Sequence, residues 1–154
     1  MSKNLFDVVI LVGPNDNEII EQMLPYTKKN VLDHRKIYLI CVDPTINIEG
    51  AITIDERIFP FSIDDISKQF GKTWRNGWYL QQLLKMYAGN FIPDLLNRYL
   101  VIDCDTHFLR PTRFITEEGK TIHTTGTENH SVYFDHMKFL YLHPFLLSYQ
   151  LFQF

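Results

Sequence analysis

The sequence is poor in cysteine, and this scarcity excludes several classes of protein. Cys41 and Cys104 are the only cysteines among 154 residues, and they stand too far apart for a CxxC zinc pair or for a disulfide framework. Such sparse usage is typical of a reducing compartment, and we expect both thiols to be buried core groups. The histidines of the last third lack zinc-finger spacing and cysteine partners, so we predict no structural zinc site.

The sequence also lacks an excess of positive charge and a long apolar run. Its formal net charge is -3, which gives no support for binding nucleic acid or an anionic membrane through a broad basic field. No run reaches the ~18 apolar residues that cross a bilayer. The apolar stretch near the amino terminus is interrupted by Asp7 and is too short for an export signal. We therefore expect a cytoplasmic protein with no transmembrane segment and no nucleic-acid partner.

What the sequence does contain is an alternation of apolar runs with helical patterns. Residues 7–12, DVVILV, and 36–42, KIYLICV, are apolar on both faces, which is typical of strands buried in a parallel sheet. Residues 51–54 and 120–124 predict two further short strands, and residues 99–102 predict another buried one. We predict an α/β fold with a mostly parallel sheet, in which residues 7–12, 36–42 and 99–102 are the central strands.

Two helix starts can be predicted between these strands. Asn15 is the predicted cap of a helix after the first strand, with Glu18 at the capping-box position. Ser62 and Asp65 predict a second helix that ends before Gly71.

The clearest helical pattern covers residues 75–89, RNGWYLQQLLKMYAG. Asn76 is its predicted cap and Gly89 its predicted end. One face is apolar and is predicted to face the core, through Leu80, Leu83, Leu84 and Tyr87. A second stripe has aromatic, amide and cationic side chains, from Trp78, Gln81, Gln82 and Lys85.

Two aspartates stand where the strand at residues 99–102 ends. Because side chains alternate along a strand, Asp103 and Asp105 are predicted to point to one side and Cys104 to the other. Two adjacent carboxylates repel each other unless a cation lies between them. Magnesium and manganese accept one or two carboxylates when phosphates supply further ligands. The pair therefore predicts a metal and diphosphate site, which His107 would approach if the alternation continued, although imidazole suits magnesium poorly.

The segments YLVIDCDTHFLRP and WRNGWYLQQLLKMYAG together resemble the donor-binding region of GT-A-fold glycosyltransferases. The likeness is greatest to a largely uncharacterised family of bacterial and viral nucleotide-sugar transferases. It begins at VVILVGPND and reaches YFDHM, nearly the whole chain. It implies a GT-A, Rossmann-like fold in a single domain, residues 1–154. Residues 1–105 would be the nucleotide-sugar-binding half, and residues 106–154 would begin the acceptor half.

The resemblance also implies site residues and an activity. A sugar would be transferred from a nucleotide-diphosphate-sugar to an unknown glycan, lipid or protein acceptor, and no catalytic base is identified. The metal, Mn²⁺ or Mg²⁺, would be bound by Asp103 and Asp105. The residues expected on the donor side are Gly13, Pro14, Asn15, Asp16, Arg75, Gln81, Gln82, Lys85 and Asp103.

The chain departs from this pattern after the two aspartates. A GT-A enzyme needs a segment there to hold the acceptor and, in inverting enzymes, to supply a base. Residues 139–154, FLYLHPFLLSYQLFQF, are mostly apolar, so we expect an incomplete acceptor half, poor transfer and an exposed apolar surface that favours self-association. Two alternatives stay open. One is a haloacid-dehalogenase-type phosphatase with Asp103 as nucleophile, and the other is a non-catalytic nucleotide-sugar-binding fragment.

Overall fold

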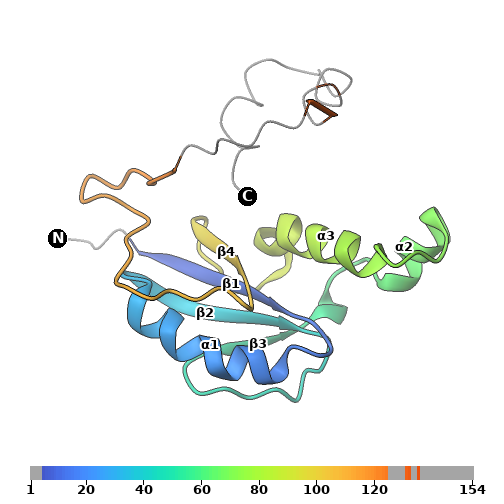
Figure 1. The fold of residues 1–154 in the computed structure, drawn as a ribbon, viewed down its shortest axis with the longest axis horizontal. Coiled ribbons are helices and arrows are strands. Elements are labelled where there is room, and N and C mark those ends of the chain that lie inside the picture. The colour runs from blue at the N-terminus through green and yellow to red at the C-terminus, as the bar shows by residue number, and fades with distance from the viewer. Residues whose placement is uncertain (1–4, 125–130, 133–134, 136–154) are drawn as a thin grey trace.

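The structure, a computed structural model, describes residues 5–124, 131–132 and 135 (Figure 1). The strands and helices of this part follow one another as β1 (Phe6–Val12), α1 (Asn17–Asn30), β2 (His34–Cys41), β3 (Ile52–Asp55), the short 3-10 helix η1 (Glu56–Ile58), α2 (Ile63–Phe70), α3 (Asn76–Phe91) and β4 (Tyr99–Asp103). Most of the expected acceptor half, including the apolar residues 139–154, lies outside the described residues.

The four strands form one sheet in the order β3-β2-β1-β4, and every neighbouring pair is parallel. The predicted α/β class and parallel sheet are confirmed, and β1 and β2 are central. The prediction that residues 99–102 form a central strand is wrong for the described sheet, because β4 is one of its two outer strands and is only half-buried. An apolar pattern on both faces reports contact with layers above and below a strand, not the presence of neighbours on both sides.

Alternating residues of the strands enter two separate cores. On one face, Val8 and Ile10 of β1 pack with Ile20 and Leu24 of α1. The opposite face packs against α2 and α3, with Val9 and Leu11 in one cluster with Ile66, Leu80, Leu84 and Ala88. Figure 1 shows α1 on one side of the sheet and α2 with α3 on the other. Because the strands are all parallel, the connections after β1, β2 and β3 leave the sheet at one edge, its carboxyl edge.

The starts of the first two helices differ in how well the sequence predicted them. The capping box Ser62–Asp65 of α2 is confirmed, since each side chain bonds the other residue's backbone N–H, and Gly71 ends the helix with a φ of 75°. The predicted Asn15 cap of α1 is wrong. Asp16 occupies the cap position, and its carboxylate accepts a hydrogen bond from the Gly13 N–H rather than from the helix.

Helix α3 confirms the core positions Leu80 and Leu84 but corrects both predicted ends. Leu83 is half-buried, and the prediction that Tyr87 faces the core is wrong, since it is 42% exposed. Asn76 is the first helical residue, and its buried side chain donates to Gly71 O and Ser67 Oγ of the α2 end. The helix continues past Gly89 to Phe91. A Cβ at Gly89 would lie 3.0 Å from Tyr99 Oη, so this glycine permits close packing against β4 instead of ending the helix.

A buried ion pair lies at the amino edge of the sheet. The Asp7 carboxylate is fully buried and accepts hydrogen bonds from Arg35 Nε at 2.9 Å and from the Leu96 N–H at 2.8 Å. Burial by itself would raise the pKa of Asp7, but the hydrogen bonds from Arg35 and Leu96 hold it below the ordinary aspartate value. This pair joins β1 to β2 and to the segment before β4.

Three further predictions can be compared with the fold. Residues 120–124 form no strand in the described structure; an isolated bridge pairs Ile115 with Thr121. Cys41 is buried as predicted, whereas Cys104 is half-buried. Within the described part of the chain, none of the helices has the length and apolar character needed to cross a membrane.

Candidate functional site

The candidate site lies at the carboxyl edge of the sheet, where β1 and β4 end side by side. Leu11 of β1 pairs in register with Asp103 of β4. The chain places β2 and β3 on one side of β1 and β4 on the other, so the connections diverge at this point. Open α/β sheets bind ligands in the crevice at such a switch of strand order.

The loop after β1 turns back on itself beside this edge. The Gly13 N–H donates to Asp16 Oδ2 at 3.1 Å, and the Asp16 N–H donates to Gly13 O at 3.2 Å. A Cβ added at Gly13 would lie 2.7 Å from Asp16 Oδ2, so any larger residue would push the Asp16 side chain away. Pro14 and Asn15 are exposed at the tip of the loop. Gly13, Pro14 and Asn15 therefore form a short rim at the surface, and the Asp16 carboxylate points back into the loop.

Cys104 connects this loop to the end of β4. Burial raises the pKa of its thiol, and the negative charge of Asp16, which also accepts a hydrogen bond from the thiol, raises it further, to about 12. The charge of Asp105 acts in the same direction. Cys104 packs with Leu100 and Ile102 on the α1 side of the sheet. The Asp16 charge therefore lies close to the Cys104 thiol, which brings the β1 loop near the end of β4.

Asp103 points toward the opposite layer and meets helix α3. Lys85 Nζ donates to Asp103 Oδ1 at 2.6 Å. The Lys85 side chain is 17% exposed, whereas the Asp103 side chain is 63% exposed. The cation of this pair is therefore largely buried, and its carboxylate faces solvent. Gln81 and Gln82 are half-buried and lie one turn before Lys85 on the same face of the helix. The structure thus brings Lys85, the last residue of the polar stripe of α3, to the end of β4.

Arg75 is not part of this cluster. It occupies the cap position of α3, ten residues before Lys85, which is ~15 Å along a helix. Its guanidinium lies 4.8 Å from the ring centre of Trp74 and its side chain is exposed. Of the four helix residues predicted to face the donor, Lys85 contacts an aspartate and Arg75 lies at the far end of the helix.

The strand alternation ends at Asp103. The Thr106 N–H donates to Asp103 O at 3.1 Å, so the chain turns there and Asp105 lies in the turn, exposed to solvent. The ring of His107 packs edge-on against Tyr26 of α1, 5.0 Å between centres. The expectation that His107 continues on the side of Asp103 is wrong, because the turn directs it to the α1 layer. That Asp103 and Asp105 face one ligand stays a prediction.

These residues fit a metal only in one particular way. Among the described residues, no group of three or more His, Cys, Asp or Glu side chains converges to hold an ion. Two exposed carboxylates, Asp103 and Asp105, stand at the edge instead. Hard divalent cations bind with one or two carboxylates when phosphate oxygens and water complete the ligand set. The donor set therefore suits Mn²⁺ or Mg²⁺ shared with a phosphorylated ligand, and does not suit a cation held by protein alone.

The sequence did not single out one further carboxylate at the same edge. Glu56 follows β3 directly and is half-buried. Burial raises its pKa, and the neighbouring charge of Asp55 adds to the effect. Asp55 itself is held by Arg57, whose Nη2 lies 2.5 Å from Asp55 Oδ2. Its position could have indicated it, since Glu56 comes just after the third predicted strand and so at the carboxyl edge of the sheet.

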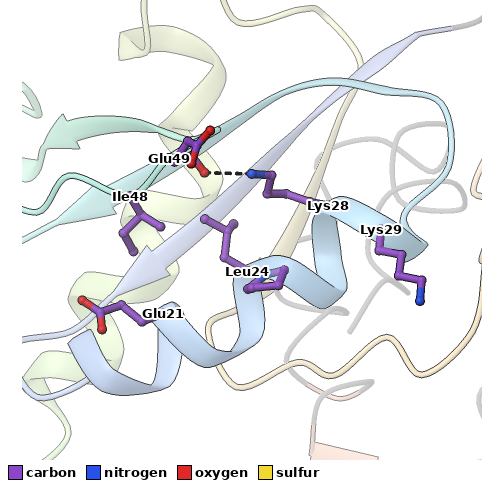
Figure 2. Close-up of a pocket in the computed structure, with 7 residues that line it drawn as sticks. Glu21, Leu24, Lys28, Lys29, Ile48 and Glu49 are labelled. Carbon is purple, nitrogen blue, oxygen red and sulfur yellow. Dashed lines mark hydrogen bonds between the residues drawn. The ribbon is translucent and has the colours of Figure 1, made fainter.

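A hollow in the described structure lies away from these residues. It lies between α1 and the connection from β2 to β3 (Figure 2). Figure 2 shows Lys28 reaching across it, and Lys28 Nζ donates to Glu49 O at 2.9 Å. The residues around it are Glu21, Leu24, Pro25, Lys28, Lys29, Ile48 and Glu49. None of them belongs to the predicted site.

Comparison with known proteins places the chain in a family without assigning an activity. No curated protein and no solved structure matches it. One family model does match, over residues 2–146, and so covers nearly the entire sequence, including the β1 loop, α3 and the two aspartates. The chain therefore belongs to DUF6492, a family of unknown function.

Proposed function

We propose that this protein is a metal-dependent glycosyltransferase of the GT-A fold that binds a nucleotide-diphosphate-sugar at the carboxyl edge of β1 and β4. The observation that supports this most is the Lys85–Asp103 pair. It gives the DxD segment a cation from α3 at the switch point of a parallel sheet, where phosphorylated ligands are commonly bound. The acceptor would be a glycan, a lipid or a protein, and the predicted location is the cytoplasm.

In this proposal, the side chains at the edge divide the ligand between them. Asp103 and Asp105 would hold Mn²⁺ or Mg²⁺, which when bound neutralises charge on the leaving diphosphate. Lys85 Nζ is already held at this edge by Asp103 and can donate to a phosphate oxygen. The rim of Gly13, Pro14 and Asn15 would border the nucleoside, because it lies on the β1 side of the same edge.

The position of Lys85 has a physical advantage for diphosphate binding. Its side chain is largely buried, so its charge is less screened by water than that of a surface lysine. The charge of Lys85, which contacts Asp103, offsets only one of the two aspartate charges, so the edge keeps a net negative charge that favours recruitment of a divalent metal. Lys85 would then stabilise the growing negative charge of the diphosphate beside that metal.

The first prediction concerns donor binding. The ligands to test are the diphosphates of uridine, guanosine and thymidine and their sugars. In the presence of MnCl₂, at least one of them should raise the melting temperature of the protein. Saturation at about one hundred times Kd corresponds to ~2.7 kcal/mol of stabilisation. Asp103→Asn and Asp105→Asn should remove the manganese-dependent part, because each loses the negative charge that attracts the metal while keeping its shape. Lys85→Met should weaken binding by removing the cation.

Asp94→Asn is the matched control, since Asp94 lies at the opposite edge of the sheet beside Lys36. It should leave donor binding unchanged. Equal manganese-dependent stabilisation of the wild type and both DxD variants would contradict the assignment of the metal site. Two enzymatic measurements separate the alternatives. If the protein hydrolyses p-nitrophenyl phosphate and Asp103→Asn abolishes this activity, the protein is a phosphatase. Donor binding without nucleotide release or transfer would identify a non-catalytic fragment.

A further inference from the structure

An aromatic row crosses the junction of α2 and α3 and ends in an exposed tryptophan. The rings of Phe70 and Tyr79 stack with centres 5.6 Å apart, and Trp78 packs edge-on against Tyr79 at 5.3 Å. Trp78 remains 55% exposed. The ring is thus positioned by its neighbours while much of its surface faces solvent. An exposed ring that its neighbours hold in place can stack on a ligand without first having to be ordered.

Trp78 lies on the same face of α3 as the residues that reach the candidate site. Trp78, Gln82 and Lys85 follow one another at the spacing i, i+4 and i+7, which aligns them along one face. Lys85 contacts Asp103 at one end of this face. The exposed indole lies ~10 Å farther along the helix axis. The half-buried amides of Gln81 and Gln82 lie between them.

We propose that this face of α3 binds the sugar chain of a carbohydrate acceptor, with Trp78 as its stacking platform and with Gln81 and Gln82 as hydrogen-bonding groups. The inference rests on the proposed glycosyltransferase function and names its acceptor class. A pyranose ring has one face of C–H bonds, which packs on an aromatic ring, and a rim of hydroxyl groups. A glutamine amide can both donate to and accept from those hydroxyls.

The distance from the aspartates distinguishes the acceptor from the donor. If the diphosphate is held at Asp103, the donor sugar occupies the space next to it. A platform ~10 Å farther along the helix then contacts the next sugar in line. The two polar amides also distinguish this face from a purely apolar surface, which would suit another protein or a lipid chain.

The chain is well suited to a fluorescence test, because Trp74 and Trp78 are its only tryptophans. The full-length Trp74→Phe variant leaves Trp78 as the sole indole. Binding to an array of diverse glycans identifies a bound oligosaccharide, which is then titrated while Trp78 emission is recorded. We expect a saturable change in emission. Trp78→Ala should bind that oligosaccharide about tenfold or more weakly, whereas Trp78→Phe, which keeps a ring, should retain most of the affinity.

Trp74→Ala is the matched control, because Trp74 is 87% exposed but precedes the helix and lies outside its polar face. It should bind glycans as the wild type does. Both alanine variants should keep the wild-type circular dichroism spectrum and the manganese-dependent donor binding. The absence of any bound glycan, or equal binding by Trp78→Ala and the wild type, would overturn the inference.

Two other outcomes distinguish a glycan platform from a membrane contact and from a failure of the proposed transferase function. The protein could instead bind no glycan and sediment with vesicles of phosphatidylcholine and phosphatidylserine. If Trp74→Ala and Trp78→Ala both abolish that sedimentation, the tryptophans contact a membrane and the acceptor assignment is overturned. Glycan binding that depends on Trp78 in a protein that binds no nucleotide-sugar would support the platform and contradict the proposed transferase.

Discussion

At the amino end of β1, the Asp7 carboxylate is withdrawn from solvent and accepts hydrogen bonds from Arg35, from the Lys36 N–H and from the Leu96 N–H. Asp7→Ala would remove the buried partner of Arg35, which would keep its contacts with Asp94. It would also leave the Lys36 and Leu96 N–H groups without this acceptor. Breaking a buried pair from one side costs about 3–5 kcal/mol, and we expect a loss of that size in the free energy of unfolding by urea. Asp94→Asn, at an exposed carboxylate beside the same arginine, should change it by less than about 1 kcal/mol.

The same residue predicts a dependence of stability on acid. The pKa of Asp7 is lower in the folded protein than in the unfolded chain. The stabilisation by its charge is therefore complete above the unfolded aspartate pKa, about 4, and is lost as pH falls through the lower folded value. Urea unfolding between neutral pH and pH 3 should show this decline. Asp7→Asn should be less stable at neutral pH and should lose less stability on acidification; an unchanged acid dependence would contradict the assignment.

The thiol of Cys104 tests the contact that closes the β1 loop. Burial and the Asp16 carboxylate raise its pKa to about 12, so little reactive thiolate is present at pH 8. In a Cys41→Ala background, which leaves one thiol, iodoacetamide should react slowly. Asp16→Asn should accelerate alkylation several-fold by removing the negative charge, since each pKa unit changes the thiolate fraction about tenfold. Glu18→Gln, on the exposed part of α1, is the control. Equal rates in Asp16→Asn and the control would show that the contact is absent in solution.

At the scale of single elements, helix α2 depends on its N-cap residue, Ser62, which precedes Ile63. Ser62 Oγ accepts from the Asp65 N–H, and Asp65 Oδ2 accepts from the Ser62 N–H. The helix has only eight residues, so it has few internal hydrogen bonds to compensate for a lost cap. Ser62→Ala should lower the free energy of unfolding by about 1 kcal/mol. Lys68→Ala, at an exposed position of the same helix, should change it by less than about 0.5 kcal/mol. Equal effects would show that the cap adds no stability.

Helix ends were predicted well only where their cause is local. The α2 capping box involves residues three positions apart, and both are visible in the sequence. The end of α3 is different, because Gly89 is retained inside the helix against the Tyr99 ring. That contact joins α3 to β4 and has no local sequence signal. The start of α1 is similar, since the Asp16 carboxylate bonds Gly13 and Cys104 in place of the helix.

At the scale of the whole molecule, the candidate site combines residues from three places in the chain. The sequence indicated Asp103 and Asp105 because two carboxylates follow an apolar strand. It also indicated a polar stripe on α3. That Lys85 of this stripe meets Asp103 follows from the packing of α3 on β4. That Arg75 lies at the far end of the helix follows from where α3 begins.

The sequence by itself determined the α/β class, the parallel strands and the position of the two aspartates, because periodicity and turn residues act over a few neighbouring positions. Only the tertiary structure decided that β4 lies outside β1 and that the loop of Asp16 contacts Cys104. It alone also decided that His107 turns to α1 and that Lys85 binds Asp103. These contacts join residues far apart in the chain, and their geometry depends on how whole layers pack.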